Sequence, residues 1–327
     1  MNYNIKEVIT NYDRKKVASF LKDFGFKYEN VDFSIYIDIE KEVIATVSAR
    51  HNIITFFAIK QEFQAENIAG YLLSYMINHL ATIGIDHLFI YTTLKYYNYF
   101  ENMGFKVILL TDEVAVLESN NYDISEELNK IKVKYFLNED KYNAVCLNAN
   151  PFTNGHLHLI KSILKQGLPL IVFVLEEDKS FFSFFDRFNM VKLGLKKVDK
   201  VTVVPSTYYL ISNLTFPTYF LKNDLDKVKV EGMVDALIFK NYFMKIFNIQ
   251  KRMVGEEIDP TTNSYNEVLK EVLKDDLIII PRKKVSGDII SASLVREKYK
   301  IKDFESISSF VPKSVVAYLK VLRNNYG

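Results

Sequence analysis

The segment 150–156, Asn-Pro-Phe-Thr-Asn-Gly-His, limits the possible folds of this chain more than any other, because of what flanks it. The apolar run 144–147 precedes it and is typical of a buried strand. Leu157, Ile160 and Leu164 follow at helical spacing, which places His156 at the N-terminus of a helix. Free backbone N–H groups and the helix dipole attract phosphates to such a terminus. The segment therefore predicts a phosphate site on a strand-to-helix turn.

An ordinary helix start is the alternative interpretation of the same residues. Thr153 or Asn154 would then only cap the helix, and Gly155 would only allow a tight bend. We favour the phosphate site because the strand before the segment and the helix after it are both indicated by the sequence.

A second segment, 290–296 (Ile-Ser-Ala-Ser-Leu-Val-Arg), has the same kind of chemistry. Either Ser291 or Ser293 can cap a helix that carries Arg296. Serine hydroxyls donate to phosphate oxygens, and the planar guanidinium of arginine matches them. A capped helix with a surface arginine is the alternative, but two such segments in one domain are hard to obtain by chance.

Length and composition indicate an ordinary globular protein. The 327 residues suffice for two domains, and 42 Lys and Arg against 40 Asp and Glu give no support for nucleic-acid binding through bulk charge. The single cysteine, Cys146, excludes an intrachain disulfide and fits a reducing cytoplasm, and we expect it in a buried strand. We find no apolar leader and no run that would span a bilayer, so we expect a cytoplasmic protein without a membrane partner.

Three regions follow one another along the chain. Residues 1–120 mix strands and helices, and the strand that begins at Gly104 is expected to be their last. Residues 121–142 are expected to form a linker helix and a loop. From residue 143 to 327 strands alternate with helices, which predicts an α/β domain with a parallel sheet. Its expected strands are 145–149, 170–175, 201–204, 236–239 and 277–280, and its expected helices are 155–165, 186–197, 218–226, 263–274, 291–300 and 312–322.

The first region resembles the GNAT acetyltransferase superfamily. The resemblance rests on Tyr97, Phe100, Gly104 and Phe105 and on the helix that opens near residues 64–70. In that superfamily a glycine-rich turn before this helix binds the pyrophosphate of a coenzyme A-like group. Here the turn 64–69 lacks those glycines, so the domain is expected either to dock a pantetheine arm or to be scaffold.

The whole chain resembles the citrate lyase ligase family of the nucleotidylyltransferase superfamily, whose signatures are Thr-x-Gly-His and Ile-Ser-x-Ser/Thr-x-x-Arg. Segment 215–222, Thr-Phe-Pro-Thr-Tyr-Phe-Leu-Lys, is the most specific of the remaining matches. Further segments carry the resemblance: 148–156, 177–180, 184–187, 211–222, 254–257, 260–266, 280–283 and 290–296. The resemblance implies a GNAT-like α+β domain at the N-terminus, followed along the chain by a Rossmann-like catalytic domain.

The activity implied by the resemblance is an AMP-forming ligation. Acetate attacks the α-phosphorus of ATP, and the acetyl-adenylate then acetylates the thiol of the dephospho-coenzyme-A-derived arm on the acyl-carrier subunit of citrate lyase. Thr153, His156 and Arg296 are the implied catalytic residues. Mg²⁺ is the implied counter-ion, with no protein ligand assigned. The implied nucleotide-binding residues are Asn148, Ala149, Asn150, Phe152, Gly155, His156, Ser291, Ser293, Arg296 and Lys222.

Two other functions remain open at this point. One is an adenylyltransferase of phosphopantetheine or of a nicotinamide nucleotide, which would not need the first domain. The other is a non-catalytic protein that binds a carrier. Arg187 and Arg282 can also meet phosphates, although for both a solvated surface charge is the preferred interpretation. Glu256 and Glu257 can bind Mg²⁺ or cap a helix, and capping is preferred.

Overall fold

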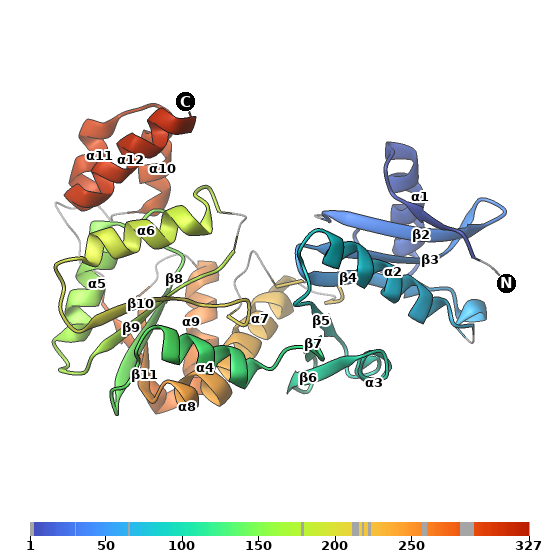
Figure 1. The fold of residues 1–327 in the computed structure, drawn as a ribbon, viewed down its shortest axis with the longest axis horizontal. Coiled ribbons are helices and arrows are strands. Elements are labelled where there is room, and N and C mark those ends of the chain that lie inside the picture. Colours follow the sequence, from blue (N-terminus) through green and yellow to red (C-terminus); the bar gives the residue numbers. More distant parts are fainter. Residues whose placement is uncertain are drawn as a thin grey trace. The chain divides into compact units, whose positions relative to one another are not determined.

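The computed structural model describes residues 3–29, 31–64, 66–177, 180–210, 216–217, 219–221, 224–256, 260–281 and 291–326. The chain divides into two compact units (Figure 1). Unit 1 comprises residues 1–123 and 217–230, and unit 2 comprises residues 124–216 and 231–327. The domain boundaries expected from the sequence, 1–120, 121–142 and 143–327, stay a prediction.

Unit 1 is built on a seven-stranded mixed sheet in the order β1-β2-β3-β4-β5-β7-β6. All of its pairs are antiparallel except β4 with β5, which run parallel and pair Ile53 with Phe89. The strands are β1 (Ile5–Glu7), β2 (Phe33–Ile39), β3 (Glu42–Arg50), β4 (Ile53–Ile59), β5 (Phe89–Thr92), β6 (Phe105–Leu110) and β7 (Ala115–Ser119). The helices are α1 (Asn11–Lys22), a 3-10 turn (Gln61–Phe63), α2 (Ile68–Thr82) and α3 (Tyr97–Glu101).

The returning segment 217–230 packs into unit 1 through Tyr219. Its ring lies 4.5 Å from that of Phe56 and 5.2 Å from that of Phe26, centroid to centroid. Burial raises the pKa of Tyr219, although a hydrogen bond with the backbone of Phe56 opposes this. Part of the most family-specific segment thus contributes to the core of unit 1.

Unit 2 is built on a five-stranded, entirely parallel sheet in the order β10-β9-β8-β11-β12. The first strand of this unit, β8, is central, and the order reverses between β8 and β11. In open sheets of this kind ligands bind outside the carboxyl ends of the strands at the reversal point. The strands are β8 (Tyr142–Leu147), β9 (Leu170–Val174), β10 (Val201–Pro205), β11 (Ile249–Gly255) and β12 (Leu277–Ile280).

Helices cover both faces of this sheet (Figure 1). Val145, Leu147 and Met253 face the larger core, to which α5, α6 and the three C-terminal helices contribute. The other face packs against α7, a π-helical turn and α9. The helices are α4 (Ile124–Lys134), α5 (Asn154–Leu164), α6 (Phe184–Leu195), α7 (Asp224–Ile238), the π-helix (Phe239–Phe243), α8 (Met244–Ile246), α9 (Pro260–Leu273), a 3-10 turn (Lys274–Asp276), α10 (Ala292–Lys300), α11 (Phe304–Phe310) and α12 (Lys313–Tyr326).

The predicted fold class is confirmed, since an α+β unit precedes an α/β unit with a parallel sheet. The predicted strand 236–239 is wrong, because these residues end α7 and begin the π-helix. Phe239, Phe243 and Phe247 recur every fourth residue and pack one helical face against Phe173 of β9. A four-residue apolar run does not distinguish a strand from a helix by itself.

Three further differences concern which elements form and where they begin. The strand Ile249–Gly255 was not expected, because its sequence Ile-Gln-Lys-Arg-Met-Val-Gly carries charges in the middle. The expected helix 218–226 is wrong at its start, since Tyr219 and Phe220 form a turn and α7 begins at Asp224. The strand from Gly104 is not the last of its region, because β7 follows it. In the described ranges, no helix is both long and apolar enough to cross a membrane.

Candidate functional site

The first predicted segment connects the central strand β8 to α5. Thr153 is the N-cap of α5, and its hydroxyl accepts a hydrogen bond from the His156 amide at 3.4 Å. Ala149 has a φ of 51°, a left-handed conformation that turns the chain at the end of the strand. The structure therefore places the segment where the sequence predicts it, on a strand-to-helix turn at the carboxyl end of β8.

The His156 ring is oriented by the same cap. The backbone N–H of Thr153 donates to Nδ1 of His156 at 3.0 Å, and the Thr153 hydroxyl lies 2.9 Å from the same atom. Because Nδ1 accepts from an amide, the proton of the neutral ring resides on Nε2. His156 is thus held in the tautomer that has an Nε2–H group to donate.

The Phe152 ring packs against the ring of His156. Its side chain is fully buried, and its ring is stacked at 20° on that of His156 with the centroids 5.6 Å apart. Gly194 of α6 allows this, since a Cβ there would lie 2.5 Å from the Phe152 ring. The Phe152 side chain is therefore part of the core and fixes the loop against α6.

The second predicted segment begins α10, and Ser291 rather than Ser293 is its N-cap. The Ser291 hydroxyl accepts from the amides of Ser293 at 3.1 Å and Leu294 at 3.3 Å. Arg296 then reaches across to the first segment: its Nη1 donates to the Asn150 carbonyl at 2.6 Å, and its Nη2 donates to Ser293 Oγ at 2.8 Å. The structure thus brings together two segments 146 residues apart.

Arg187 of α6 is not the solvated surface charge that the sequence suggested, and that interpretation is wrong. Its side chain is fully buried. The guanidinium donates to the carbonyls of Asn148 at 2.9 Å and Leu175 at 2.8 Å, and to those of Phe182 and Glu177. Arg187 therefore ties the ends of β8 and β9 together and supports the start of segment 148–156.

The loop after β9 also supports the first segment. The Phe182 amide donates to Asn150 Oδ1 at 3.1 Å, and the Ser180 hydroxyl donates to Asn148 Oδ1 at 3.2 Å. Glu177 is 4% exposed and lies 3.9 Å from Arg187, oxygen to nitrogen. The side-chain oxygens of Asn148 and Asn150 thus accept hydrogen bonds from residues 180 and 182 and stabilise the loop.

Sequence reasoning missed Gly194 and the supporting role of Arg187. The only signal for Arg187 was its place in the family-specific stretch 184–187, and Gly194 carried none, because a close approach between helix and ring depends on packing. Lys222, Arg282 and Glu257 lie outside the described residues. Glu256 donates its amide to the Ile280 carbonyl at 2.9 Å, which joins β11 to β12.

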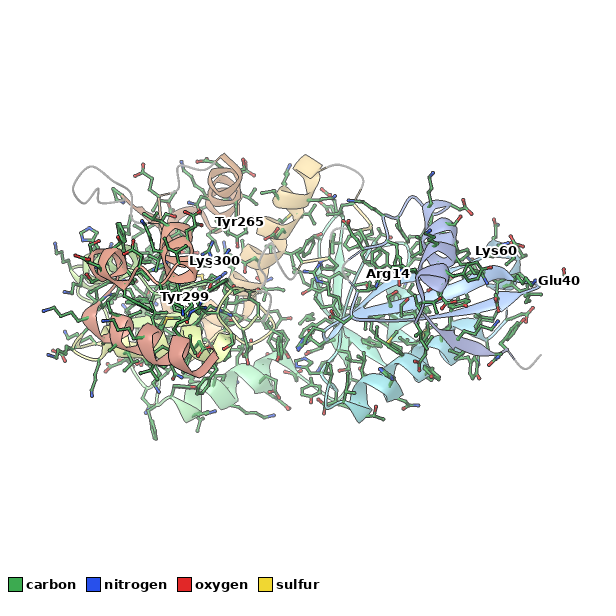
Figure 2. The ribbon with its side chains drawn as sticks, turned by 90° about the horizontal axis from the view of Figure 1, so that it is seen from above. Arg14, Glu40, Lys60, Tyr265, Tyr299 and Lys300 are labelled. Atoms are coloured by element: carbon green, nitrogen blue, oxygen red, sulfur yellow. The ribbon has the colours of Figure 1, made fainter. Side chains whose placement is uncertain are left out.

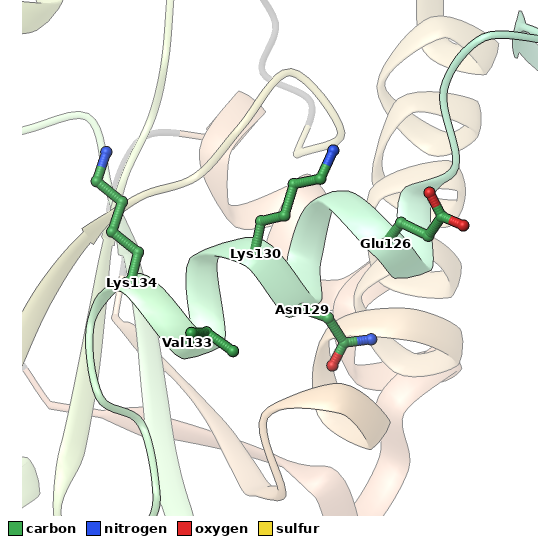
Figure 3. Close-up of a pocket in the computed structure, with 5 residues that line it drawn as sticks. All are labelled: Glu126, Asn129, Lys130, Val133 and Lys134. Atoms are coloured by element: carbon green, nitrogen blue, oxygen red, sulfur yellow. The ribbon is translucent and has the colours of Figure 1, made fainter.

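Among the described residues we also searched for metal ligands and for pockets. Within the described ranges, no group of three or more His, Cys, Asp or Glu side chains is placed to hold a metal ion. A shallow hollow on α4 is lined by Glu126, Asn129, Lys130, Val133 and Lys134 (Figure 3). All five side chains come from one helix, so the hollow brings no distant groups together and does not form a site.

Comparison with known proteins decides the family. The family model described as the citrate lyase ligase C-terminal domain matches residues 142–319. A protein of Haemophilus influenzae named [citrate [pro-3S]-lyase] ligase is 31% identical over 93% of this chain and 94% of its own length. Proteins of the same name from Klebsiella pneumoniae and Escherichia coli are 29% and 30% identical over 94% and 95% of this chain, and over 93% and 92% of their own lengths.

The chain belongs to the citrate lyase ligase family. The predicted enzyme class, a ligase, is therefore confirmed, and the matches extend over both units. Both site segments of this ligase lie inside the matched residues 142–319.

Some solved structures are similar to about a third of this chain. Escherichia coli ElaA is 10% identical with a TM-score of 0.31, covering 36% of this chain and 99% of ElaA. A GNAT-family acetyltransferase of Staphylococcus aureus Mu50 is 13% identical with a TM-score of 0.32, covering 37% of this chain and all of that protein.

Proposed function

We propose that this ligase activates acetate as acetyl-adenylate with ATP and then acetylates the thiol of the prosthetic arm on the citrate lyase acyl-carrier subunit. The relatives' name supports citrate lyase as the target of ligation. The chemistry and the individual residue roles are our inference from the geometry of unit 2.

One observation carries the proposal: Arg296 joins the second segment to the first by its 2.6 Å hydrogen bond to the Asn150 carbonyl. The amides at the start of α5, the Nε2–H of His156 and the hydroxyls of the second segment are therefore gathered at the carboxyl end of β8. Amides, hydroxyls and a guanidinium are all donors, and such a set suits the oxygens of a triphosphate.

In the activation step an acetate oxygen attacks the α-phosphorus, and the bond between this phosphorus and the pyrophosphate oxygen breaks. Charge builds up on the α-phosphate and on the leaving pyrophosphate. We assign His156 Nε2–H to the α- and β-phosphate oxygens, and Ser291, Ser293 and Arg296 to the β- and γ-phosphates. The Thr153 hydroxyl is assigned to the α- and β-phosphates on the family resemblance, and it would have to turn away from Nδ1 of His156 to donate there. Preorganised donors of this kind are worth about a hundredfold or more in rate each.

Mg²⁺ neutralises part of the triphosphate charge when bound, and the triphosphate itself supplies oxygen ligands for it. The donor set of the described site is neutral or positive, so it suits the phosphates rather than the metal. Lys222 is also assigned to the phosphates, on the family resemblance alone.

In the second step the thiol attacks the acetyl carbonyl carbon, and AMP leaves with the electrons of the broken carbon–oxygen bond. The thiol proton passes to solvent or to the departing phosphate. Activation is needed because a free carboxylate has no leaving group that a thiol can displace.

The test is pyrophosphate release from ATP and Mg²⁺, with and without acetate, followed by addition of deacetylated citrate lyase. We expect acetate-dependent release with AMP formation and recovery of lyase activity. Release only with phosphopantetheine would instead support an adenylyltransferase, and no release under any combination would favour a carrier-binding protein.

Paired histidine variants test the residue assignment. His156→Ala should lower acetate-dependent pyrophosphate release by about a hundredfold or more. His158→Ala is the matched control, because His158 lies in the same helix and contacts only Ser162, at 3.4 Å, among the hydrogen bonds described for it. Circular dichroism establishes that both variants fold, and unchanged turnover in folded His156→Ala would contradict the assignment.

A further inference from the structure

Three aromatic rings of unit 2 form a continuous row. The Phe181 ring, in the loop before α6, lies 5.9 Å from that of Tyr299 on α10, centroid to centroid. The Tyr299 ring lies 6.0 Å from that of Phe304 at the start of α11. Tyr299 is 5% exposed, whereas Phe181 is 45% exposed. The row therefore joins a surface loop to the C-terminal helices through a buried ring.

A cation lies over each ring of this row. Lys300, which neighbours Tyr299 on α10 (Figure 2), and Lys320 on α12 are both exposed. Such contacts hold long side chains in place without neutralising their charge. The distances from the cationic atom to the ring centroid are 5.6 Å from Lys300 Nζ to Phe181, 5.6 Å from Arg323 Cζ to Tyr299 and 5.8 Å from Lys320 Nζ to Phe304.

The helices α10, α11 and α12 carry an excess of positive charge. Residues 291–323 hold seven Lys and Arg against three Asp and Glu, whereas the rest of the chain holds 35 against 37. Among the described residues Lys298 is paired with Asp303 at 3.2 Å, but Lys300 and Lys320 form no ion pair. The two exposed lysines therefore give this face a local positive charge that the nearly balanced composition of the whole chain conceals.

Exposed apolar side chains accompany these lysines. Ile301 follows Lys300 and is 69% exposed, and Val321 follows Lys320 and is 57% exposed. We call these four residues together with Phe181 the basic–apolar surface. A protein partner would cover its charged and its apolar groups at once, whereas a small anion would use only the lysines.

The basic–apolar surface is continuous with the proposed phosphate site. Lys300 lies four residues after Arg296 on α10, which is about 6 Å along the helix axis. Arg296 donates to the Asn150 carbonyl at 2.6 Å. In the loop before α6, the amide of Phe182, the residue after Phe181, donates to Asn150 Oδ1 at 3.1 Å. Both parts of the surface are thus joined to the same residue of the phosphate loop.

We propose that the basic–apolar surface docks an acidic face of the citrate lyase acyl-carrier subunit. The inference rests on the proposed function, because the thiol of that subunit must reach the acetyl-adenylate at the carboxyl end of β8. Docking next to the phosphate loop raises the effective concentration of the thiol there. Acidic side chains on the partner complement Lys300 and Lys320 and steer its approach.

Two other occupants fit the surface less well. A second copy of the chain would bring the same lysines against each other in a symmetric pair, and like charges repel. A nucleic acid would need open rings on which bases stack, but the Tyr299 ring is buried and the whole chain is almost balanced in charge. An acidic protein is therefore the occupant that the charge and the exposed apolar groups favour.

The test separates docking from activation. Acetate-dependent exchange of labelled pyrophosphate into ATP reports the activation step without citrate lyase, and acetylation of deacetylated citrate lyase reports the step that needs docking. In the double variant Lys300→Gln/Lys320→Glu we expect the KM for citrate lyase to rise about tenfold, while the exchange rate stays within about twofold. Glutamine replaces Lys300 because a glutamate one turn after Arg296 would compete for its guanidinium.

The matched control is Lys270→Gln/Lys197→Glu, which changes the net charge by the same amount. Both lysines are exposed, and they come shortly before β12 and β10, so they lie toward the edge of the sheet opposite to the proposed site. The control should leave the exchange rate and the KM for citrate lyase unchanged. Added NaCl should raise this KM more steeply in the wild type than in the surface variant.

A second variant keeps the test decisive if the double variant does not fold. Ile301→Ser removes an exposed apolar group and should raise the KM for citrate lyase about threefold without changing the exchange rate. A KM within about twofold of the wild type in both folded variants, or an equal loss of exchange, would overturn the docking site.

The remaining outcomes concern other occupants and the proposed function. Loss of DNA binding or of self-association in the double variant, with an unchanged KM for citrate lyase, would overturn the docking site and assign the surface to a nucleic acid or to a second copy. Wild-type protein without acetate-dependent exchange would instead overturn the proposed function itself, so the two failures are distinguishable.

Discussion

Replacing Glu231 by glutamine should stabilise this protein at neutral pH. Glu231 lies on α7 and is 6% exposed. Burial, and then the charge of Asp235, raise the pKa of its carboxyl from an ordinary 4.5 to about 8. The folded protein therefore keeps the carboxyl neutral at pH values where the unfolded chain ionises it.

The sign and size of the effect follow from this difference. The folded state binds the extra proton, so the contribution of Glu231 to stability is fully present below pH 4.5 and is lost as pH rises toward 8. Each pH unit in that window costs about 1.4 kcal/mol. At pH 7 the free energy of unfolding is thus lowered by on the order of 3 kcal/mol, which is an upper limit because an ionised carboxylate can relax toward water.

Urea unfolding between pH 4.5 and 9, followed by circular dichroism, measures the effect. Glu231→Gln carries no titrating group, so it should match the wild type near pH 4.5 and exceed it increasingly up to about pH 8. Glu267→Gln is the control, because Glu267 is exposed on α9. The same difference from wild type at every pH would refute the buried, protonated carboxyl.

Three further perturbations test the site and its support. Gly194→Ala places a Cβ 2.5 Å from the Phe152 ring and should destabilise by about 1–3 kcal/mol and slow pyrophosphate release; a rise in Tm would mean that helix propensity outweighs the clash. Arg187→Lys should lower the free energy of unfolding by on the order of 3 kcal/mol in urea titrations, because lysine cannot serve the several carbonyls that Arg187 holds; a loss under about 0.5 kcal/mol would contradict this role. Burial raises the pKa of Cys146 to about 12, although the positive charge of Arg252 opposes this. The rate of Cys146 alkylation should therefore rise about tenfold per pH unit between pH 7 and 9. A rate that reaches a plateau below pH 9 would contradict that pKa.

The local structure of the site could be predicted from the sequence because its determinants are local. Thr153 caps the helix three residues before His156, and Ser291 caps the helix that carries Arg296, each through contacts within one turn. Hydroxyl caps and helical periodicity act over a few residues, so a single sequence reports them. The same reasoning identified most strands of the parallel sheet.

The secondary-structure predictions were wrong where tertiary packing, rather than the local residue pattern, determines whether a segment is a helix or a strand. Residues 236–239 are apolar enough for a strand, but the Phe239 ring stacks against a helical neighbour and becomes part of a π-helix. The β11 strand was not among the expected strands, and it carries two charged residues, Lys251 and Arg252, in its middle. A buried ion pair with Asp235 makes Arg252 acceptable inside the sheet, and that partner is not visible in the strand itself.

The sequence by itself determined the family, the order of the two folds and the helix starts capped by Thr153 and Ser291. The tertiary structure alone decided that Arg296 bonds to the Asn150 carbonyl, that Arg187 is buried behind the loop, and that the buried Arg252 pairs with Asp235. These contacts join residues that lie far apart in the chain. Their energies depend on burial and on the geometry of donors and acceptors, which exist only once the sheet has assembled.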